Sequence, residues 1–599
     1  MKFPKLRVPQ TTRQMVDAFK GYNHNLRISD GEFFDMQNMT SDYYPVLSPR
    51  KKRGIYAEPE SPTGLIAKDN LCYVDGRYFV MNEYRVDLGL NDEPKQLISM
   101  GAYVIIMPDK KWINTLDLTD FGSIEATFPG VEGQTVSASY EMCKVDGTSY
   151  TNVIKQSTAP ENPENMQLWI DTSSMPHVLK QYAATSAVWN QIATTYVKIS
   201  APGIAANFSQ YDAVKITGLP EQLTQLGDLE GQISPLWEVY RDPGDTSEEN
   251  PRAEGTFDYV VVVGILDEAA GYESKLRLER TMPVMDFIVE SENRLWGCRY
   301  GVAANGEVVN ELYASKLGDF KNWNCFMGLT TDSYAASCGT DGQFTGAITH
   351  LGYPLFFKEN CVHKVYGNYP ANFQIQTTAC RGVQKGCEKS LAIVNETLFY
   401  KARSGVCAYD GSLPTEASYA LGNEVYGDAV GGAHGNKYYI TMKDMEGNPN
   451  LFVYDTGKGM WHREDNLLAD CFCSCHGELY AISDGKIITM LGTGTQDAEE
   501  VEWMVETGEI GITSPDMKYI SRLTVRMSMD VGTEVRFLAQ YDLMDDWDEI
   551  CVLEGTSLRS FSVPIRPRRC DYMKLRIEGV GYAKIYSITK TIEQGSELS

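Results

Sequence analysis

The chain has 599 residues, of which 43% are hydrophobic and 22% charged, and its formal net charge is −26. One hydrophobic core does not organise a chain of this length, so several domains are expected, and the composition is that of a folded protein. The negative charge excludes a nucleic-acid binder that reads sequence on a positive surface, although DNA can slide past such a protein without sticking.

No stretch reaches the roughly 18 consecutive apolar residues that a membrane-spanning helix needs. The basic N-terminus lacks the apolar run of a signal peptide, so folding in a cytosol is expected. The 14 Cys show no disulfide framework, which favours reduced and buried thiols. Residues 1–60 are predicted to be an extended arm that carries four consecutive basic residues, Arg50, Lys51, Lys52 and Arg53.

Aromatic strands separated by turn residues follow this arm and predict a mainly β fold, since the chain holds 35 Tyr, 21 Phe and 52 Gly. The hairpin-like units are Asn70–Asn82, Leu97–Thr115, Asn293–Gly301, Asn310–Trp323, Ile348–Gly367, Ser390–Gly411, Gly431–Met442, Leu451–Asp465 and His476–Leu491. They recur at roughly 40 to 50 residues, the period of four-stranded propeller blades. The pattern predicts a β-propeller of six or seven blades; an array of β-sandwiches is the alternative.

Two regions depart from this period. Residues 121–280 are predicted to be an inserted, small β-barrel-like domain, with a surface loop over Tyr240–Thr256 and short helices at most over Met175–Ala183 and Pro220–Gly231. Residues 501–599 alternate apolar and polar side chains, which predicts a C-terminal β-sandwich-like domain. The first blade or blades then occupy 61–120, and the remainder of the propeller occupies 281–500.

Motifs for catalysis, metals or cofactors find little support. Three Cys and a His occur together in Cys471–His476, but small buried thiols of a strand explain them as well as a zinc site does. Gly382–Ser390 has the wrong spacing for a phosphate-binding loop and is predicted to connect two strands. Ala336–Gly346 is similar to the Asp-box of sialidase-like propellers but lacks its Trp. We therefore predict no enzyme activity, no catalytic residues, no metal and no cofactor.

Three segments together resemble the tail hub or nozzle proteins of tailed bacteriophages, including the packaged-DNA stabilisation family of short-tailed phages. The first matches a family pattern at Asn38, Met39, Leu47, Arg50, Arg53 and Gly54. The second comprises Asn310–Phe326 and Asp341–Gly367, and the third is Val453–Glu464. The likeness covers about Asn23–Gly54 and Asn293–Leu491, more weakly the C-terminal strands, and does not extend to residues 121–280.

The resemblance implies a structural virion protein of the tail, made in the host cytoplasm. Such proteins form a homo-oligomeric ring, most often a hexamer, below the portal and adaptor proteins of the head-tail connector. The ring surrounds the DNA exit channel, helps to retain the packaged genome, and docks fibres, spikes or a needle. An acidic lining suits this role, because a basic lining grips phosphates and stalls the passing DNA.

This role suggests a hypothesis for the basic cluster. Arg50, Lys51, Lys52 and Arg53 form a docking patch for an acidic neighbouring ring or subunit, or else they are a solvated loop before the first blade. Two other classes of protein stay open. One is a carbohydrate-active or carbohydrate-binding propeller, for example a receptor-binding protein of the tail, with the C-terminal sandwich as its sugar module. The other is an intracellular propeller scaffold, whose Gly-His and Trp-Asp signatures are missing.

Overall fold

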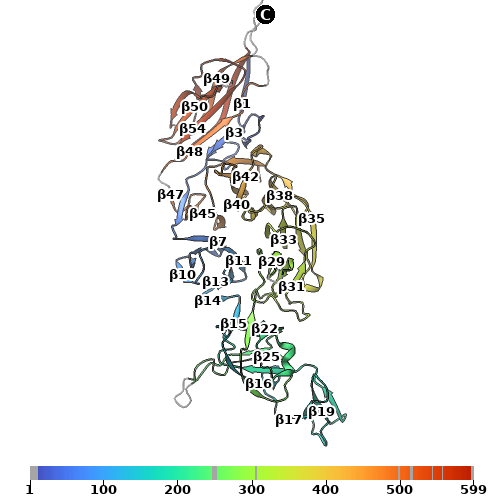
Figure 1. Ribbon diagram of the computed structural model, residues 1–599. Coiled ribbons are helices and arrows are strands. Elements are labelled where there is room, and N and C mark those ends of the chain that lie inside the picture. The colour runs from blue at the N-terminus through green and yellow to red at the C-terminus, as the bar shows by residue number, and fades with distance from the viewer. Residues whose placement is uncertain are drawn as a thin grey trace, which may run out of the picture. The chain divides into compact units, whose positions relative to one another are not determined.

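The computed structural model describes residues 11–245, 252–303, 306–496, 499–512, 517–542, 544–555 and 558–594. The protein is mainly β, with many small antiparallel sheets and only short 3-10 turns in its described part (Figure 1). The chain folds into two compact units. Unit 1 is Met1–Leu97, Gly342–Lys364 and Gln376–Ser599, and unit 2 is Ile98–Asp341 and Val365–Ile375.

Small sheets of consecutive strands make up much of unit 1. One sheet contains β7 (Pro62–Lys68), β8 (Asn70–Asp75), β9 (Tyr78–Met81) and β10 (Tyr84–Asp87). The next contains β32 (Gly346–His350), β33 (Tyr353–Lys358), β34 (Cys361–Tyr366) and β35 (Gln374–Ala379). A third contains β36 (Ala392–Val394), β37 (Thr397–Ala402), β38 (Gly405–Tyr409) and β39 (Thr415–Glu416).

The predicted hairpin over Asn70–Asn82 is confirmed. Strands β8 and β9 pair antiparallel from Asp75 opposite Tyr78 to Cys72 opposite Met81. Gly76 takes a left-handed φ of 54° in the turn, a conformation that glycine adopts without steric cost. Turns of this kind are encoded within a few residues, which is why the local sequence predicts them.

Two larger sheets of unit 1 combine early and late parts of the chain. The ten-stranded sheet runs in the order β40-β41-β42-β43-β2-β3-β48-β54-β50-β51. Its strands are β40 (Gly427–His434), β41 (Lys437–Lys443), β42 (Pro449–Asp455), β43 (Met460–Arg463), β2 (Gly21–Tyr22), β3 (Glu32–Gln37), β48 (Glu502–Thr507), β54 (Met573–Val580), β50 (Glu534–Tyr541) and β51 (Asp548–Glu554). The five-stranded sheet contains β44 (Cys471–Cys475), β45 (Glu478–Ser483), β46 (Lys486–Thr489), β6 (Gly54–Ala57) and β47 (Thr495–Gln496).

The N-terminal segment thus joins sheets formed by much later residues. Besides β2, β3 and β6, strand β1 (Thr11–Val16) pairs with β55 (Ala583–Gln594), which also pairs with β49 (Lys518–Met529). Strands β52 (Arg559–Val563) and β53 (Arg569–Cys570) complete that sheet, and β4 (Met39–Thr40) pairs with β5 (Ser48–Pro49). One hydrophobic core, including Phe33, Trp461 and Trp503, continues through these sheets.

Unit 2 holds two sheets of consecutive strands and three sheets from the predicted insertion. The first two contain β11 (Gln96–Met100), β12 (Tyr103–Met107), β13 (Lys111–Asn114) and β14 (Asp117–Ser123), and then β28 (Phe287–Ser291), β29 (Arg294–Val302), β30 (Val308–Ala314) and β31 (Tyr334–Ser337). They share a core that includes Trp112, Phe320 and Trp323. A separate core, which includes Tyr140, Val197 and Val260, lies within residues 126–278.

The sheets of the predicted insertion are small. One contains β15 (Ala126–Phe128), β27 (Arg277–Arg280), β22 (Ala213–Thr217) and β23 (Ile233–Pro235). A second contains β24 (Glu238–Tyr240), β25 (Tyr259–Val263), β21 (Tyr196–Ser200), β16 (Val136–Cys143) and β26 (Ala270–Ser274). The third contains β17 (Val153–Gln156), β18 (Leu168–Asp171), β19 (Val178–Ala183) and β20 (Val188–Gln191).

Three local predictions can be compared directly with the structure. The helix suggested over Met175–Ala183 is wrong, because β19 pairs there with β18 and β20. The helical turn suggested over Pro220–Gly231 is present as η1 (Thr224–Leu229). Residues 246–251, in the loop predicted over Tyr240–Thr256, lie outside the described residues.

Within the described ranges, no helix has both the length and the hydropathy that crossing a bilayer requires. The divisions predicted at residues 60, 120, 280 and 500 stay predictions.

Candidate functional site

The basic cluster lies in the short link between β5 and β6, inside unit 1. Gly54 begins β6 at a position where a Cβ atom would lie 2.1 Å from the carbonyl oxygen of Thr493. Only glycine fits such an approach, so β6 enters its sheet beside β46 and β47 directly after Arg53. The four basic residues are therefore held at the start of an inner strand of this sheet and do not extend from a free arm.

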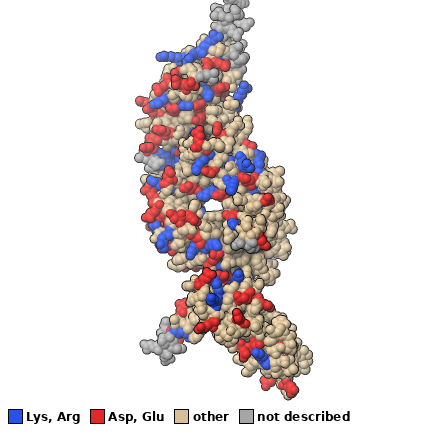
Figure 2. Space-filling model, in the orientation of Figure 1, with Lys and Arg blue, Asp and Glu red and all other residues tan. Residues whose placement is uncertain are grey.

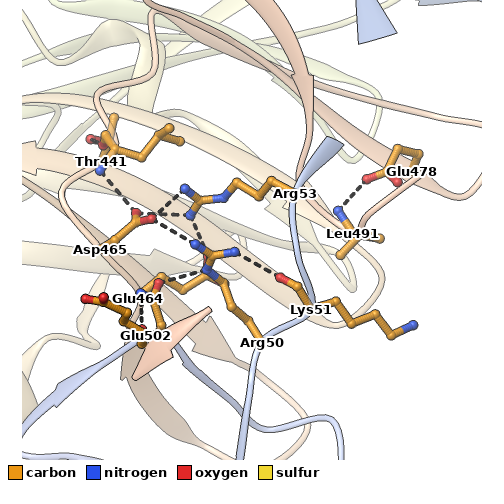
Figure 3. A network of polar contacts seen from close by, with 11 residues as sticks. Arg50, Lys51, Arg53, Thr441, Glu464, Asp465, Glu478, Leu491 and Glu502 are labelled. Carbon is orange, nitrogen blue, oxygen red and sulfur yellow. Dashed lines mark hydrogen bonds and ion pairs between the residues drawn. The ribbon is translucent and has the colours of Figure 1, made fainter. Parts of the chain in front are cut away.

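Arg53 is buried, with 7% of its surface exposed, and its guanidinium contacts two acidic side chains (Figure 3). Nη1 donates to Asp465 Oδ2 at 2.6 Å, while Nη2 donates to Asp465 Oδ1 at 3.0 Å and to Glu464 Oε2 at 2.9 Å. Burial alone lowers the pKa of Arg53, but the two carboxylates outweigh it and raise the pKa above its ordinary value. This residue is an internal cation, inaccessible to a neighbouring subunit.

Arg50 belongs to the same network. Its Nη2 donates to Asp465 Oδ2 at 3.2 Å and its Nε donates to Asn38 Oδ1 at 2.8 Å. The amide of Asn38 also donates to the backbone oxygen of Glu502 at 2.7 Å, and its backbone N–H donates to the oxygen of Glu464. Asn38 thus connects the N-terminal segment to the residues after β43 and to the start of β48.

The docking patch stays a hypothesis, but two of its four residues have acidic partners within their own chain. Arg50 and Arg53 neutralise the buried carboxylate of Glu464 and the half-buried carboxylate of Asp465, and a buried charge is stable only with such a partner. Lys52 forms an ion pair with Glu500 at 2.8 Å, and Lys51 is exposed. The structure brings the four residues together: Lys51 is exposed, Arg50 and Lys52 are partly exposed, and Arg53 is buried. A test of docking must therefore leave both arginines in place.

A polar pocket of about 360 Å³ opens beside this junction, still within unit 1. Its charged lining residues are Asp42, Arg50, Lys51, Lys437, Asp455, Lys458 and Glu464. Lys437 pairs with Asp42, and Lys458 Nζ contacts Asp455 Oδ2 at 2.8 Å. Burial raises the pKa of Asp42, but Lys437 and Thr40 hold it below its ordinary value. Arg50, Lys437 and Lys458 thus have acidic partners in the same chain, and the lining holds four cations against three carboxylates. The pocket is therefore suited to polar packing against another surface.

The structure also shows where the segments Gly382–Ser390 and Cys471–His476 lie. Gly382 packs so tightly that a Cβ would lie 1.8 Å from the oxygen of Lys358, and its segment connects β35 to β36, which confirms the predicted connecting loop. The residues of Cys471–Cys475 form β44. Among the described residues, no group of three or more His, Cys, Asp or Glu side chains is placed to hold a metal ion.

We predict that the β44 thiols are chemically inert in the folded protein. Burial, the largest cause, raises the pKa of Cys471 to about 11 and that of Cys473 to about 12, so little thiolate forms at pH 8. Ellman's reagent is expected to label them at least tenfold more slowly in the native protein than in urea. Rapid native labelling at β44, located by peptide mass spectrometry, contradicts this prediction.

Comparisons with known proteins add little to this description. No family model and no curated protein matches the sequence. Among solved structures, an exo-β-1,3-galactanase from Phanerochaete chrysosporium is similar at 9% identity and a TM-score of 0.20, covering 51% of this chain and 95% of that chain. PorZ, a surface component of the type-IX secretion system of Porphyromonas gingivalis, has 9% identity, a TM-score of 0.25 and coverages of 89% and 82%. A Trypanosoma rangeli sialidase has 8% identity, a TM-score of 0.16 and coverages of 91% and 95%.

These neighbours contradict the prediction that the chain is not an enzyme, because a galactanase and a sialidase are among them. That prediction is withdrawn. The TM-scores lie far below 0.5, so the likeness itself assigns no reaction to this chain.

Proposed function

We propose that the chain is a structural protein of a bacteriophage tail, of the hub or nozzle type. The proposal rests on the structural position of four residues that carry the family resemblance. Asn38, Arg50, Arg53 and Gly54 all belong to the junction that ties the N-terminal segment to β43, β46 and β48. A motif of this kind is typical of a structural protein, because its residues hold together backbone segments that are far apart in the chain.

We propose further that the small sheets form a seven-bladed β-propeller. The blades are the sheets of β7–β10, β11–β14, β28–β31, β32–β35 and β36–β39, then β40–β43, and then β44–β46 with β6. The composition of the last blade supports this arrangement. Strand β6 precedes the first blade in the chain, yet it pairs with β46 of the last blade. Such pairing closes a propeller by joining its ends. In this scheme the insertion between β14 and β28 forms a barrel-like domain, and β48–β55 with β1 form the C-terminal sandwich.

In the proposed role, six copies form a ring below the portal and adaptor and surround the DNA exit channel. The net charge of −26 supports a conduit, because an acidic surface repels the phosphates of the passing duplex. Figure 2 shows Asp and Glu side chains spread over the visible face. The pocket beside Lys51 is the surface that we assign to docking of the next ring.

A carbohydrate-binding or receptor-binding protein of the tail is the second candidate. It is favoured by an aromatic groove on the inserted domain, described below. A galactanase and a sialidase, and no phage protein, occur among the similar structures named above, although their low TM-scores give that occurrence no weight.

Size in solution separates the two candidates. Six copies of the 67.0 kDa chain amount to 6 × 67.0 = 402 kDa. We expect light scattering and negative-stain electron microscopy to find a ring of that mass, alone or after addition of the adaptor protein from the same genome. A monomer or trimer that stays so with the adaptor, and that is retained on bacterial glycans, contradicts the hub function and supports the second candidate.

A further inference from the structure

The inserted domain carries a groove on the outer face of its five-stranded sheet, β24-β25-β21-β16-β26. The groove has a volume of about 560 Å³, and strands β16 and β25 of its floor are labelled in Figure 1. The inner face of the sheet packs on the core through Tyr140, Val197 and Val260. Because side chains alternate along a strand, the neighbouring Ser139, Glu141, Lys198 and Tyr259 point outward, and these four line the groove.

The strand registers place five outward residues in one row across the whole sheet. Tyr240 lies opposite Tyr259, Tyr259 opposite Ser200, Ser200 opposite Ser139, and Ser139 opposite Gly271. With adjacent strands about 4.8 Å apart, the row is about 19 Å long. It changes from aromatic rings at one end, through two hydroxyls, to bare backbone at the other end.

The aromatic end is a firm apolar wall. The rings of Tyr240 and Tyr259 are stacked, with centroids 5.0 Å apart and planes inclined by 17°. Gly147 packs so closely against the Tyr259 ring that a Cβ there would lie 2.5 Å from it. Tyr240 is 41% exposed and nearby Phe257 59% exposed, so a ligand can reach apolar ring surface here.

A fixed polar network lies beside the two serines. Glu141 and Lys198 form an ion pair and are opposite each other on β16 and β21. The hydroxyl of Ser149 donates to Glu141 Oε1 at 2.6 Å and accepts from Lys198 Nζ at 2.9 Å. These contacts give a carboxylate, an ammonium and a hydroxyl defined orientations. Polar groups that orient a ligand need such defined positions.

We propose that this groove binds a neutral oligosaccharide. Sugar rings offer apolar C–H faces to the tyrosines, and their hydroxyls both donate to and accept from the serines and the Glu141–Lys198 pair. The groove is long enough for several sugar rings in line.

The charge balance excludes the main alternatives. Among the residues that the structure describes, Glu141 and Lys198 are the only charged ones lining the groove, and they neutralise each other. This lining lacks the cationic excess that nucleic-acid phosphates or acidic sugars require. The exposed apolar surface is confined to one end, whereas an amphipathic helix needs an apolar stripe along its whole length.

The test uses the full chain on an array of short neutral oligosaccharides of glucose, galactose and mannose, with uronic- and sialic-acid oligosaccharides and single-stranded DNA beside them. We expect binding to at least one neutral oligosaccharide, and at least tenfold weaker binding by Tyr240→Ala. Gly271→Trp blocks the other end of the row, where a new Cβ has its nearest neighbour at 3.9 Å, and is expected to abolish binding.

Tyr211→Ala is the matched control, since Tyr211 is 42% exposed on the same domain and does not line the groove. Thermal unfolding confirms that each variant is folded. Binding of only acidic probes or DNA overturns the proposal, as does absence of binding to every probe, or equal binding by the wild type, Tyr240→Ala and Gly271→Trp. The inference does not depend on the hub function, because ring formation is measured separately and can fail while the groove still binds.

Discussion

Replacement of Arg53 by alanine is expected to lower the free energy of unfolding of unit 1 by about 3–5 kcal/mol, the usual cost of removing one partner of a buried ion pair. The variant leaves Asp465 and Glu464 without the guanidinium that contacts both. Urea unfolding followed by tryptophan fluorescence measures the effect, because Trp461 and Trp503 are buried in the hydrophobic core of unit 1. The urea midpoint is the quantity to compare, since a chain with two compact units need not unfold in one step.

Two further variants make the result specific to the buried network. Lys51→Ala removes a positive charge from an exposed neighbour, so its effect is expected to stay within about 0.5 kcal/mol. Arg53→Lys keeps the charge but loses the two-pronged contact with Asp465, and its stability is expected to lie between wild type and Arg53→Ala. Equal midpoints for Arg53→Ala and Lys51→Ala would show that the network contributes nothing to stability.

Local structure was largely predictable for the hairpins, because both strands and the turn lie within about twenty residues. Ile348–Gly367 contains the end of β32 and all of β33 and β34, and Ser390–Gly411 contains β36, β37 and β38, as alternating aromatic runs between turns predict. The long alternation within Ile520–Asp542 likewise corresponds to β49 and β50. Periodicity of two residues carries this information without reference to the rest of the chain.

The pairing of distant segments was not predictable in the same way. Strand β1 pairs with β55, and Tyr22 of β2 pairs with Trp461, yet no local pattern relates these positions. The register of such pairs depends on packing of the complete core, which one sequence does not display. For this reason residues 1–60 are predicted as an extended arm, although the structure builds β1, β2, β3 and β6 into three sheets shared with later strands.

Neither the arginine network of Arg50 and Arg53 nor the groove on the inserted domain could be predicted from the sequence, for the same reason. Four consecutive cations suggested a surface patch, because their acidic partners Glu464 and Asp465 follow more than four hundred positions later. The row from Tyr240 to Gly271 exists only through the registers of five strands, so its members were unremarkable in the sequence. Buried charge pairs and cross-strand rows both arise from tertiary contacts.

Acid is expected to destabilise unit 1 through a buried histidine of β43. His462 is 3% exposed, and its Nδ1 has no hydrogen-bond partner among the described residues. Burial, with a smaller contribution from Lys437, lowers its pKa to about 3. The fold therefore holds the neutral ring, while the unfolded chain takes up a proton near pH 6.5. Stability is complete above that pH and falls by about 1.4 kcal/mol per unit as the pH drops from 6.5 toward 3.

Between pH 7 and pH 5, protonation of His462 in the unfolded chain is thus expected to cost about 2 kcal/mol. His363, whose pKa burial lowers to about 4, acts in the same direction, so the variant His462→Phe should reduce the acid sensitivity of the urea midpoint without abolishing it. His476→Asn, at an exposed turn, is the control and should keep the full sensitivity. If His462→Phe and His476→Asn lose the same stability between pH 7 and pH 5 as the wild type, the destabilisation comes from other groups. A smaller loss in His462→Phe alone identifies a buried neutral ring, packed where β43 meets the N-terminal strand β2, as an acid-sensitive point of the junction.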